Sequence, residues 1–134
     1  RYYYKLVRDV KKTLPLAKEI NRAVIETYEY LQTLPNDKAR TRHIKMVEKG
    51  LKEQYTPRMK KLTFAQGKLL IKLVNRECNQ SSYQLVKAFM GPFKAGFYQA
   101  FAALFGASLK KEYHPDDEDK MIERIVTLVE NGQL

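Results

Sequence analysis

Apolar side chains recur every three or four residues along most of the chain, which is the spacing of one face of an α-helix. Between Pro15 and Leu34 they share one face, with charged residues opposite, and the apolar members are Leu16, Ile20, Val24, Tyr28 and Leu31. No segment shows the period-two alternation bounded by hairpin turns that is typical of strands. The sequence therefore predicts an all-α fold.

Prolines, glycines and cap residues divide this pattern into separate helices. Pro35 and Asn36 separate the first long helix from the second, Pro57 ends the second, and Asp116 caps the last. The predicted helices are 15–34, 37–55, 63–79, 82–89, 93–105 and 117–130, with a further helix at 1–12. A chain of 134 residues without linkers or repeats can bury one core. We therefore expect a single domain over residues 1–134, a compact bundle of five to seven helices.

The composition excludes several classes of protein. No apolar run approaches the roughly 20 residues of a membrane-spanning helix, so no transmembrane segment is expected. Cys78 is the only cysteine and cannot form an internal disulfide, so we expect a buried free thiol. Residues 114–119 bring one His together with four Asp and Glu, but their spacing matches no calcium loop or zinc site. Neither a metal nor a cofactor is expected.

Positive charge is concentrated in the first half of the chain. The formal net charge is +10, and residues 1–61 hold 16 Lys and Arg against 7 Asp and Glu. Five cations of the predicted helix 37–55 fall within an arc of about 80° and form a stripe about 21 Å long. These are Lys38, Arg42, Lys45, Lys49 and Lys52. A solvated helix face is the simplest interpretation, and an anion-binding surface is the alternative. No motif for specific nucleic-acid recognition accompanies the stripe.

Two polar residues stand on the apolar face of the predicted helix 63–79. With Phe64 as origin, Gln66 and Glu77 fall at about 200° and 220°, within an apolar arc from about 140° to 340°. A carboxylate buried there needs hydrogen bonds or a cation. We expect a buried polar pair, with Glu77 bonded to a cation or hydroxyl. The alternative is that Glu77 faces a cleft as a general acid, although no second carboxylate is identified. Lys68, Lys72, Asn75 and Arg76 form the opposite, polar face.

Gly67 lies in the same predicted helix. A glycine inside a helix costs about 1 kcal/mol relative to alanine, so we expect another backbone to pass close to it. The expected neighbour is the predicted helix 93–105, which is apolar nearly all round and has a side of small residues. That segment is predicted to be the central helix of the core.

Several motifs point to a family. The longest runs from Leu62 to Glu77 as LTxxQGxLxIKLxxRE, and further matches are Ser82-Tyr83, Leu104-Phe105-Gly106 and the turn Tyr113-x-Pro115. With these motifs the chain resembles a family of small bacterial domains of unknown function over nearly its whole length. It departs from that family at Asn75, where an Asp is expected, at Cys78-Asn79 in place of Thr-Gly, and at Tyr98 in place of Trp.

The resemblance implies a location more than an activity. Members of that family come from Gram-negative bacteria and often have exported precursors, which implies a periplasmic or cell-envelope location for this chain. An envelope protein or an anionic polymer would then be its partner, and the sequence identifies no other. The resemblance supplies no catalytic residues.

These observations favour a non-catalytic binding or interaction module at the cell envelope. A cell-wall glycan hydrolase that uses Glu77 as its general acid is the alternative function. Unspecific nucleic-acid binding through the basic helix 37–55 ranks third.

Overall fold

The computed structural model describes residues 1–79 and 113–134, which form four α-helices and no strand. Helix α1 spans Tyr2–Leu31, α2 spans Asp37–Met59, α3 spans Phe64–Asn79 and α5 spans Lys120–Glu130. The all-α prediction is confirmed for these residues, and none of the four helices combines the length and hydrophobicity that a membrane span requires. The predicted helices 82–89 and 93–105 lie outside the described residues.

Helix α1 is one continuous helix of 30 residues, so the predicted separation of 1–12 from 15–34 is wrong. Pro15 lies inside it. A proline has no backbone N–H, so the carbonyl of Lys11, four residues earlier, lacks its helical partner. Because Pro15 and Lys11 are both exposed, water can reach that carbonyl. The helix therefore continues through the proline, and it ends at Leu31 rather than at Leu34.

Helix α2 also passes through a proline. Pro57 does not end the helix, as the sequence predicts, because it is exposed in the last turn and the missing hydrogen bond falls on the solvent side. The extra turn buries Met59, which is 1% exposed, together with Tyr55. At the other end, Asn36 caps the helix as predicted, and its Oδ1 accepts a hydrogen bond from the backbone N–H of Ala39 at 2.9 Å.

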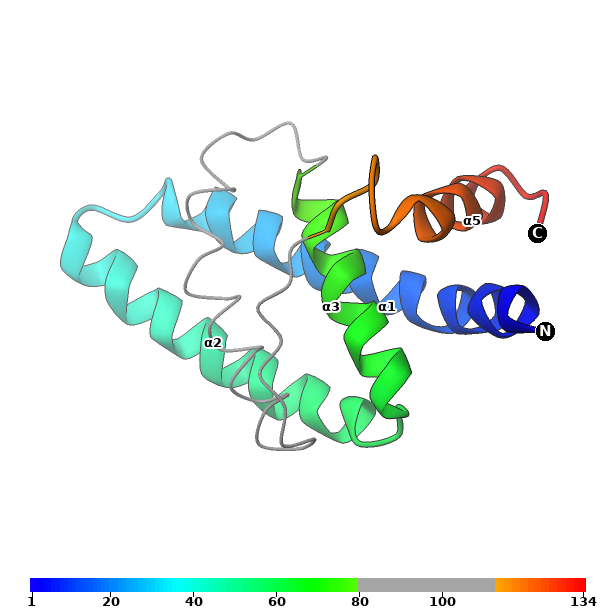
Figure 1. The fold of residues 1–134 in the computed structure, drawn as a ribbon. Helices are drawn as coiled ribbons and strands as arrows, with labels where there is room; N and C mark the ends of the chain where they lie inside the picture. Colours follow the sequence, from blue (N-terminus) through cyan, green and yellow to red (C-terminus); the bar gives the residue numbers. More distant parts are fainter. Residues whose placement is uncertain (80–112) are drawn as a thin grey trace.

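Helix α1 forms the axis of the fold, and each of the other three described helices contacts it. In Figure 1, α3 crosses α1 near its middle, and α2 returns from the far end of α1 after the turn at residues 32–36. The core lies where α3, α5 and the end of α2 meet α1. Its largest fully buried side chains are Val10, Ile20, Val24, Tyr55, Met59, Leu70, Leu73, Ile125 and Val126.

Helix α5 begins later than the sequence predicts. Residues 115–119 form turns, so the helix starts at Lys120 and its N-cap is Asp119 rather than Asp116. Ile125 and Val126 are fully buried, whereas Met121 is 47% exposed. Because the helix starts late, the side chain of Asp119 is available for contacts outside α5.

Candidate functional site

Gln66 belongs to a capping box at the start of α3. The Thr63 hydroxyl oxygen accepts a hydrogen bond from the Gln66 backbone N–H, and Oε1 of Gln66 accepts one from the Thr63 backbone N–H, both at 3.1 Å. Nε2 of Gln66 also donates to Oδ1 of Asp9 on α1 at 2.9 Å, and both of these residues are buried. Gln66 therefore occupies the apolar face of α3 because it completes the helix start and bonds α3 to α1.

Arg76 lies at the centre of an ion network between α3 and α5. The sequence places it on the polar face of α3, yet it is 4% exposed, and Asn75 beside it is also buried. The Arg76 guanidinium donates to Oε2 of Glu123 at 2.7 Å and to Oε1 of Glu130 at 3.1 Å. Both carboxylates belong to α5. The predicted polar face of α3 is thus not a solvent-facing surface at Arg76, because α5 presents carboxylates to it.

Glu77 is a further member of this network. It is 9% exposed, and its Oε1 accepts a hydrogen bond from the Arg76 guanidinium at 2.9 Å. The same oxygen lies 3.2 Å from Nζ of Lys18 on α1, and Lys18 in turn pairs with Glu130 at 2.7 Å. Glu77 is therefore bound by two cations, one from its own helix and one from α1.

A second set of contacts fixes the segment that leads into α5. The Tyr113 hydroxyl donates to Oε2 of Glu123 at 2.7 Å. The side chain of Lys72 on α3 pairs with Oδ1 of Asp119, and Oδ2 of Asp119 accepts a hydrogen bond from the His114 backbone N–H at 2.9 Å. We call Lys18, Arg76, Glu77, Tyr113, Glu123 and Glu130 the ion network, and the Lys72–Asp119 pair extends it along α3.

The contacts of the ion network shift the pKa values of Lys18, Tyr113, Glu123 and Glu130 away from neutral pH. Burial alone would raise the pKa of Glu123, but hydrogen bonds from Arg76 and Tyr113 outweigh it and lower that pKa. Burial would likewise raise the pKa of Glu130, but the bond from Lys18 and the charge of Arg76 lower it. Burial would lower the pKa of Lys18, whereas its carboxylate partners raise it. Burial, then the bond to Glu123, raises the pKa of Tyr113. These four groups suit stable pairing rather than proton transfer near neutral pH.

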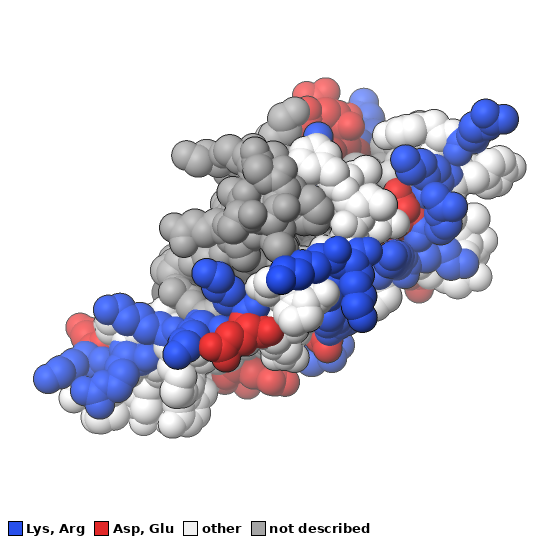
Figure 2. All heavy atoms as spheres, turned by 90° about the horizontal axis from the view of Figure 1, so that it is seen from below, with Lys and Arg blue, Asp and Glu red and all other residues white. Residues whose placement is uncertain are grey.

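The predicted anion-binding stripe lies on α2, and its five members are all exposed: Lys38, Arg42, Lys45, Lys49 and Lys52. None of them forms an ion pair with a side chain that the structure describes. Figure 2 shows Lys and Arg side chains from one end to the other of the described part of the face seen from below, with some Asp and Glu side chains between them. The stripe is therefore a solvated surface whose charges are available to a partner.

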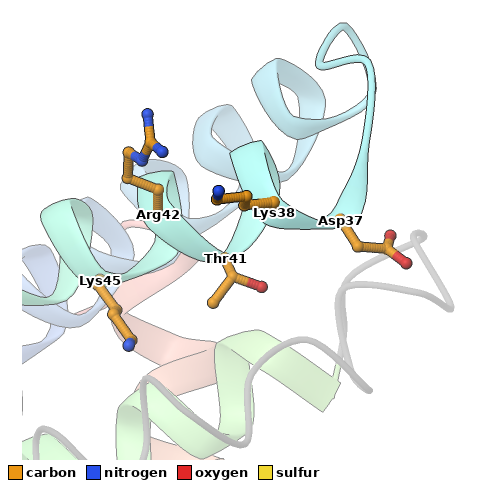
Figure 3. A pocket seen from close by; sticks show the side chains of 5 residues that line it. All are labelled: Asp37, Lys38, Thr41, Arg42 and Lys45. Carbon is orange, nitrogen blue, oxygen red and sulfur yellow. The ribbon is translucent and has the colours of Figure 1, made fainter.

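The start of α2 carries an open depression of about 460 Å³, lined by Asp37, Lys38, Thr41, Arg42 and Lys45. Figure 3 shows that the side chains of Arg42 and Lys45 extend in different directions and do not meet at one point. Divergent cations suit contacts with several anionic groups of an extended partner better than the capture of one small anion.

Comparison with known protein families identifies this chain's relatives. A family model described as Domain of unknown function (DUF4294) matches residues 1–128. The chain belongs to this family. The DUF4294 match covers α1, α2, α3 and most of α5, and it confirms the resemblance seen in the sequence. No curated protein and no solved structure matches the chain. The description of the DUF4294 family assigns no activity to its members.

Sequence reasoning finds some residues of this DUF4294 domain and misses others. Gln66 and Glu77 are identified as polar residues on an apolar face, and the Thr-x-x-Gln spacing that explains Gln66 is readable in the sequence. Arg76, Glu123 and Glu130 are missed. They lie on helices whose packing a single sequence does not reveal, so no local signal distinguishes them from solvent-exposed charges.

Proposed function

We propose that this DUF4294 domain is a non-catalytic binding module that presents the basic surface of α2 to an anionic polymer at the bacterial cell envelope. The burial and the ion pairs of Glu77 are the observation that supports a non-catalytic function. A general acid has to deliver its proton to a substrate in an open cleft. Glu77 is buried and bound to Arg76 and Lys18, so the geometry does not favour the glycan hydrolase alternative.

The choice of an anionic polymer rests on the stripe. Its five cations are exposed, and the three that line the depression at the start of α2 do not converge on one point. A surface of this kind attracts polyanions through many weak, salt-sensitive contacts and confers little sequence preference. The envelope location rests on the resemblance to a bacterial family. Members of that family often have exported precursors. Lipopolysaccharide is a polyanion that a protein meets in that compartment.

We further propose that residues 1–134 form one compact domain, a bundle of five to seven helices. The other three described helices each contact α1. The apolar periodicity of residues 82–89 and 93–105 favours two more helices in the same domain.

The proposal is tested with the full chain and lipopolysaccharide as the probe, in solutions of increasing salt. We expect binding that weakens steeply as salt rises. The double variant Lys45→Glu/Lys49→Glu should bind several-fold more weakly than wild type. The matched control is Lys11→Glu/Lys12→Glu, which makes the same change in net charge at two exposed residues of α1. The control should retain more binding than the α2 variant does.

An equal loss of binding in both variants would show that only net charge matters, and it would refute a specific role for the stripe. Random-sequence DNA serves as a second probe. Weak DNA binding with the same salt dependence is expected of any basic surface. DNA binding that survives high salt or selects one sequence would contradict the envelope module and favour a nucleic-acid function.

A further inference from the structure

A second pocket lies where the N-terminal part of α1 and the first half of α3 meet α5. Its volume is about 210 Å³. It shares no residue with the stripe on α2. The apolar part of its wall includes Leu6 of α1, Leu69 of α3 and Ile122 of α5. Three helices thus contribute a small apolar surface that remains open to solvent.

Cations surround this apolar surface. Lys5, Lys68 and Lys72 line the pocket, whereas Asp9 is the only acid among the lining residues that the structure describes. The Asp9 carboxylate keeps its charge, although its Oδ1 accepts a hydrogen bond from Gln66, and the three lysines outnumber it. Lysine therefore dominates the charge at the pocket, and a negative ligand is favoured there.

Two of the three lysines are available to a ligand. Lys72 pairs with Asp119, whereas Lys5 and Lys68 form no ion pair with a side chain that the structure describes. The ammonium of Lys68 lies 5.5 Å from the centre of the Phe64 ring, a contact that leaves its positive charge uncompensated. The pocket thus combines two uncompensated cations with an apolar wall.

We propose that this pocket binds a small amphipathic anion, a carboxylate or phosphate head group attached to a short apolar body. The head group contacts Lys5 and Lys68, and the body covers Leu6, Leu69 and Ile122. The size of the pocket supports a small ligand, because sites for drug-sized molecules measure about 300–1,000 Å³. The inference is independent of the proposed polymer binding, since it concerns other residues on other helices.

The test measures binding of octanoate and octyl phosphate to the full chain by calorimetry and by NMR shift changes, at concentrations below micelle formation. Both probes should bind saturably and perturb the amides around Lys5 and Lys68. Octanol, which lacks the charge, and inorganic phosphate, which lacks the apolar body, should each bind at least about tenfold more weakly. The ratio of the two amphiphile affinities identifies the preferred head group.

Three variants locate the site. Ala65→Trp places a large side chain at an exposed position of the pocket wall and should abolish binding. Lys5→Gln/Lys68→Gln should weaken binding about tenfold. The matched control Lys60→Gln/Lys61→Gln removes two charges from exposed residues outside the pocket and should bind like wild type. A circular dichroism melt of each variant establishes that it is folded.

Several outcomes would overturn the inference. They are the absence of saturable binding to folded wild type, octanol binding as tight as that of octanoate, and binding that folded Ala65→Trp leaves unchanged. The inference would also be refuted if Lys5→Gln/Lys68→Gln and the control Lys60→Gln/Lys61→Gln weakened binding equally. Binding to anionic vesicles without binding to either monomeric amphiphile would mean a membrane surface is recognised instead.

Discussion

Arg76 of α3 donates to Oε2 of Glu123 of α5 at 2.7 Å, and the same guanidinium reaches Glu130 at the last turn of α5. One buried side chain thus holds both ends of an 11-residue helix. Helices of that length are marginal on their own in water, so α5 depends on tertiary contacts. Its apolar face supplies most of the burial, and the ion network determines how α5 sits on α3.

Replacement of the central cation is expected to destabilise the fold strongly. Arg76→Met removes the guanidinium and leaves three carboxylates close together, of which Glu77 is buried. Removal of one partner of a buried ion pair typically costs about 3–5 kcal/mol, and because Glu123 and Glu130 are partly exposed we expect about 3 kcal/mol. The loss is measured by urea unfolding.

The control for this prediction is Arg58→Met. Arg58 pairs with Glu19 at 2.6 Å, but both side chains are more than 40% exposed. Such surface pairs are worth about 0–1 kcal/mol, so the control should unfold nearly like wild type. Equal losses in the two variants would mean that the ion network is no more important than a surface pair.

Gln66 and Asp9 should be energetically coupled through their hydrogen bond. Gln66→Ala removes half of the capping box and leaves the buried Asp9 without its amide partner, at an expected cost of about 1–2 kcal/mol. Thr63→Ala removes the cap alone and should cost less. A double-mutant cycle with Asp9→Ala isolates the contact between the helices. A coupling energy near zero would show that the Gln66–Asp9 contact contributes nothing to stability.

Acidification should destabilise the domain through Glu123 and Glu130. Both carboxylates have a pKa below the ordinary 4.5 in the folded state, because of their cationic and hydrogen-bonding partners. Their contribution to stability is therefore present above pH 4.5 and is lost as the pH falls through the lowered folded pKa values. The free energy of unfolding should be clearly smaller at pH 3 than at pH 7. In Glu123→Gln this difference should shrink, and an unchanged difference would exclude Glu123 as a cause.

The free energy of unfolding should also fall at high pH, because of Lys18 and Tyr113. The pKa of Lys18 is raised above 10.5 and that of Tyr113 above 10.0 in the folded state. Groups with raised pKa values stabilise the fold fully below their unfolded pKa, and this stability is lost as the pH rises through the folded values. Between about pH 5 and pH 10, the two carboxylates of the preceding prediction, Lys18 and Tyr113 should therefore cause no change in the free energy of unfolding. A Tyr113→Phe variant should lose less stability above pH 10 than wild type does.

The segment that leads into α5 should be held in place by Asp119 and not by Asp116. Asp119→Ala removes the acceptor of the His114 backbone N–H and the partner of Lys72, so the amide of His114 should exchange with solvent faster. The control Asp116→Ala changes the exposed residue that the sequence predicts as the cap, and it should leave this exchange unaltered. Faster exchange in the Asp116 variant alone would restore the sequence-based assignment.

Local patterns in the sequence account for the helices, and the failures have physical causes. Apolar periodicity and caps such as Asn36 are local properties, so the all-α fold and most helix positions follow from them. Pro15 and Pro57 mislead because a proline is tolerated where the lost hydrogen bond faces water. The partners of Gln66 and Arg76 lie 57 and 47 residues away along the chain, and no local pattern encodes such a pairing.

The central claim is that Glu77 is a structural residue whose ion pairs with Arg76 and Lys18 stabilise the fold, and urea unfolding of Glu77→Ala tests it most directly. Removal of this carboxylate leaves Arg76 buried with one partner fewer and takes one partner from Lys18. We predict that the free energy of unfolding falls by roughly 2 kcal/mol or more relative to wild type. A Glu77→Ala variant that unfolds at the same urea concentration and with the same slope as wild type would contradict the claim.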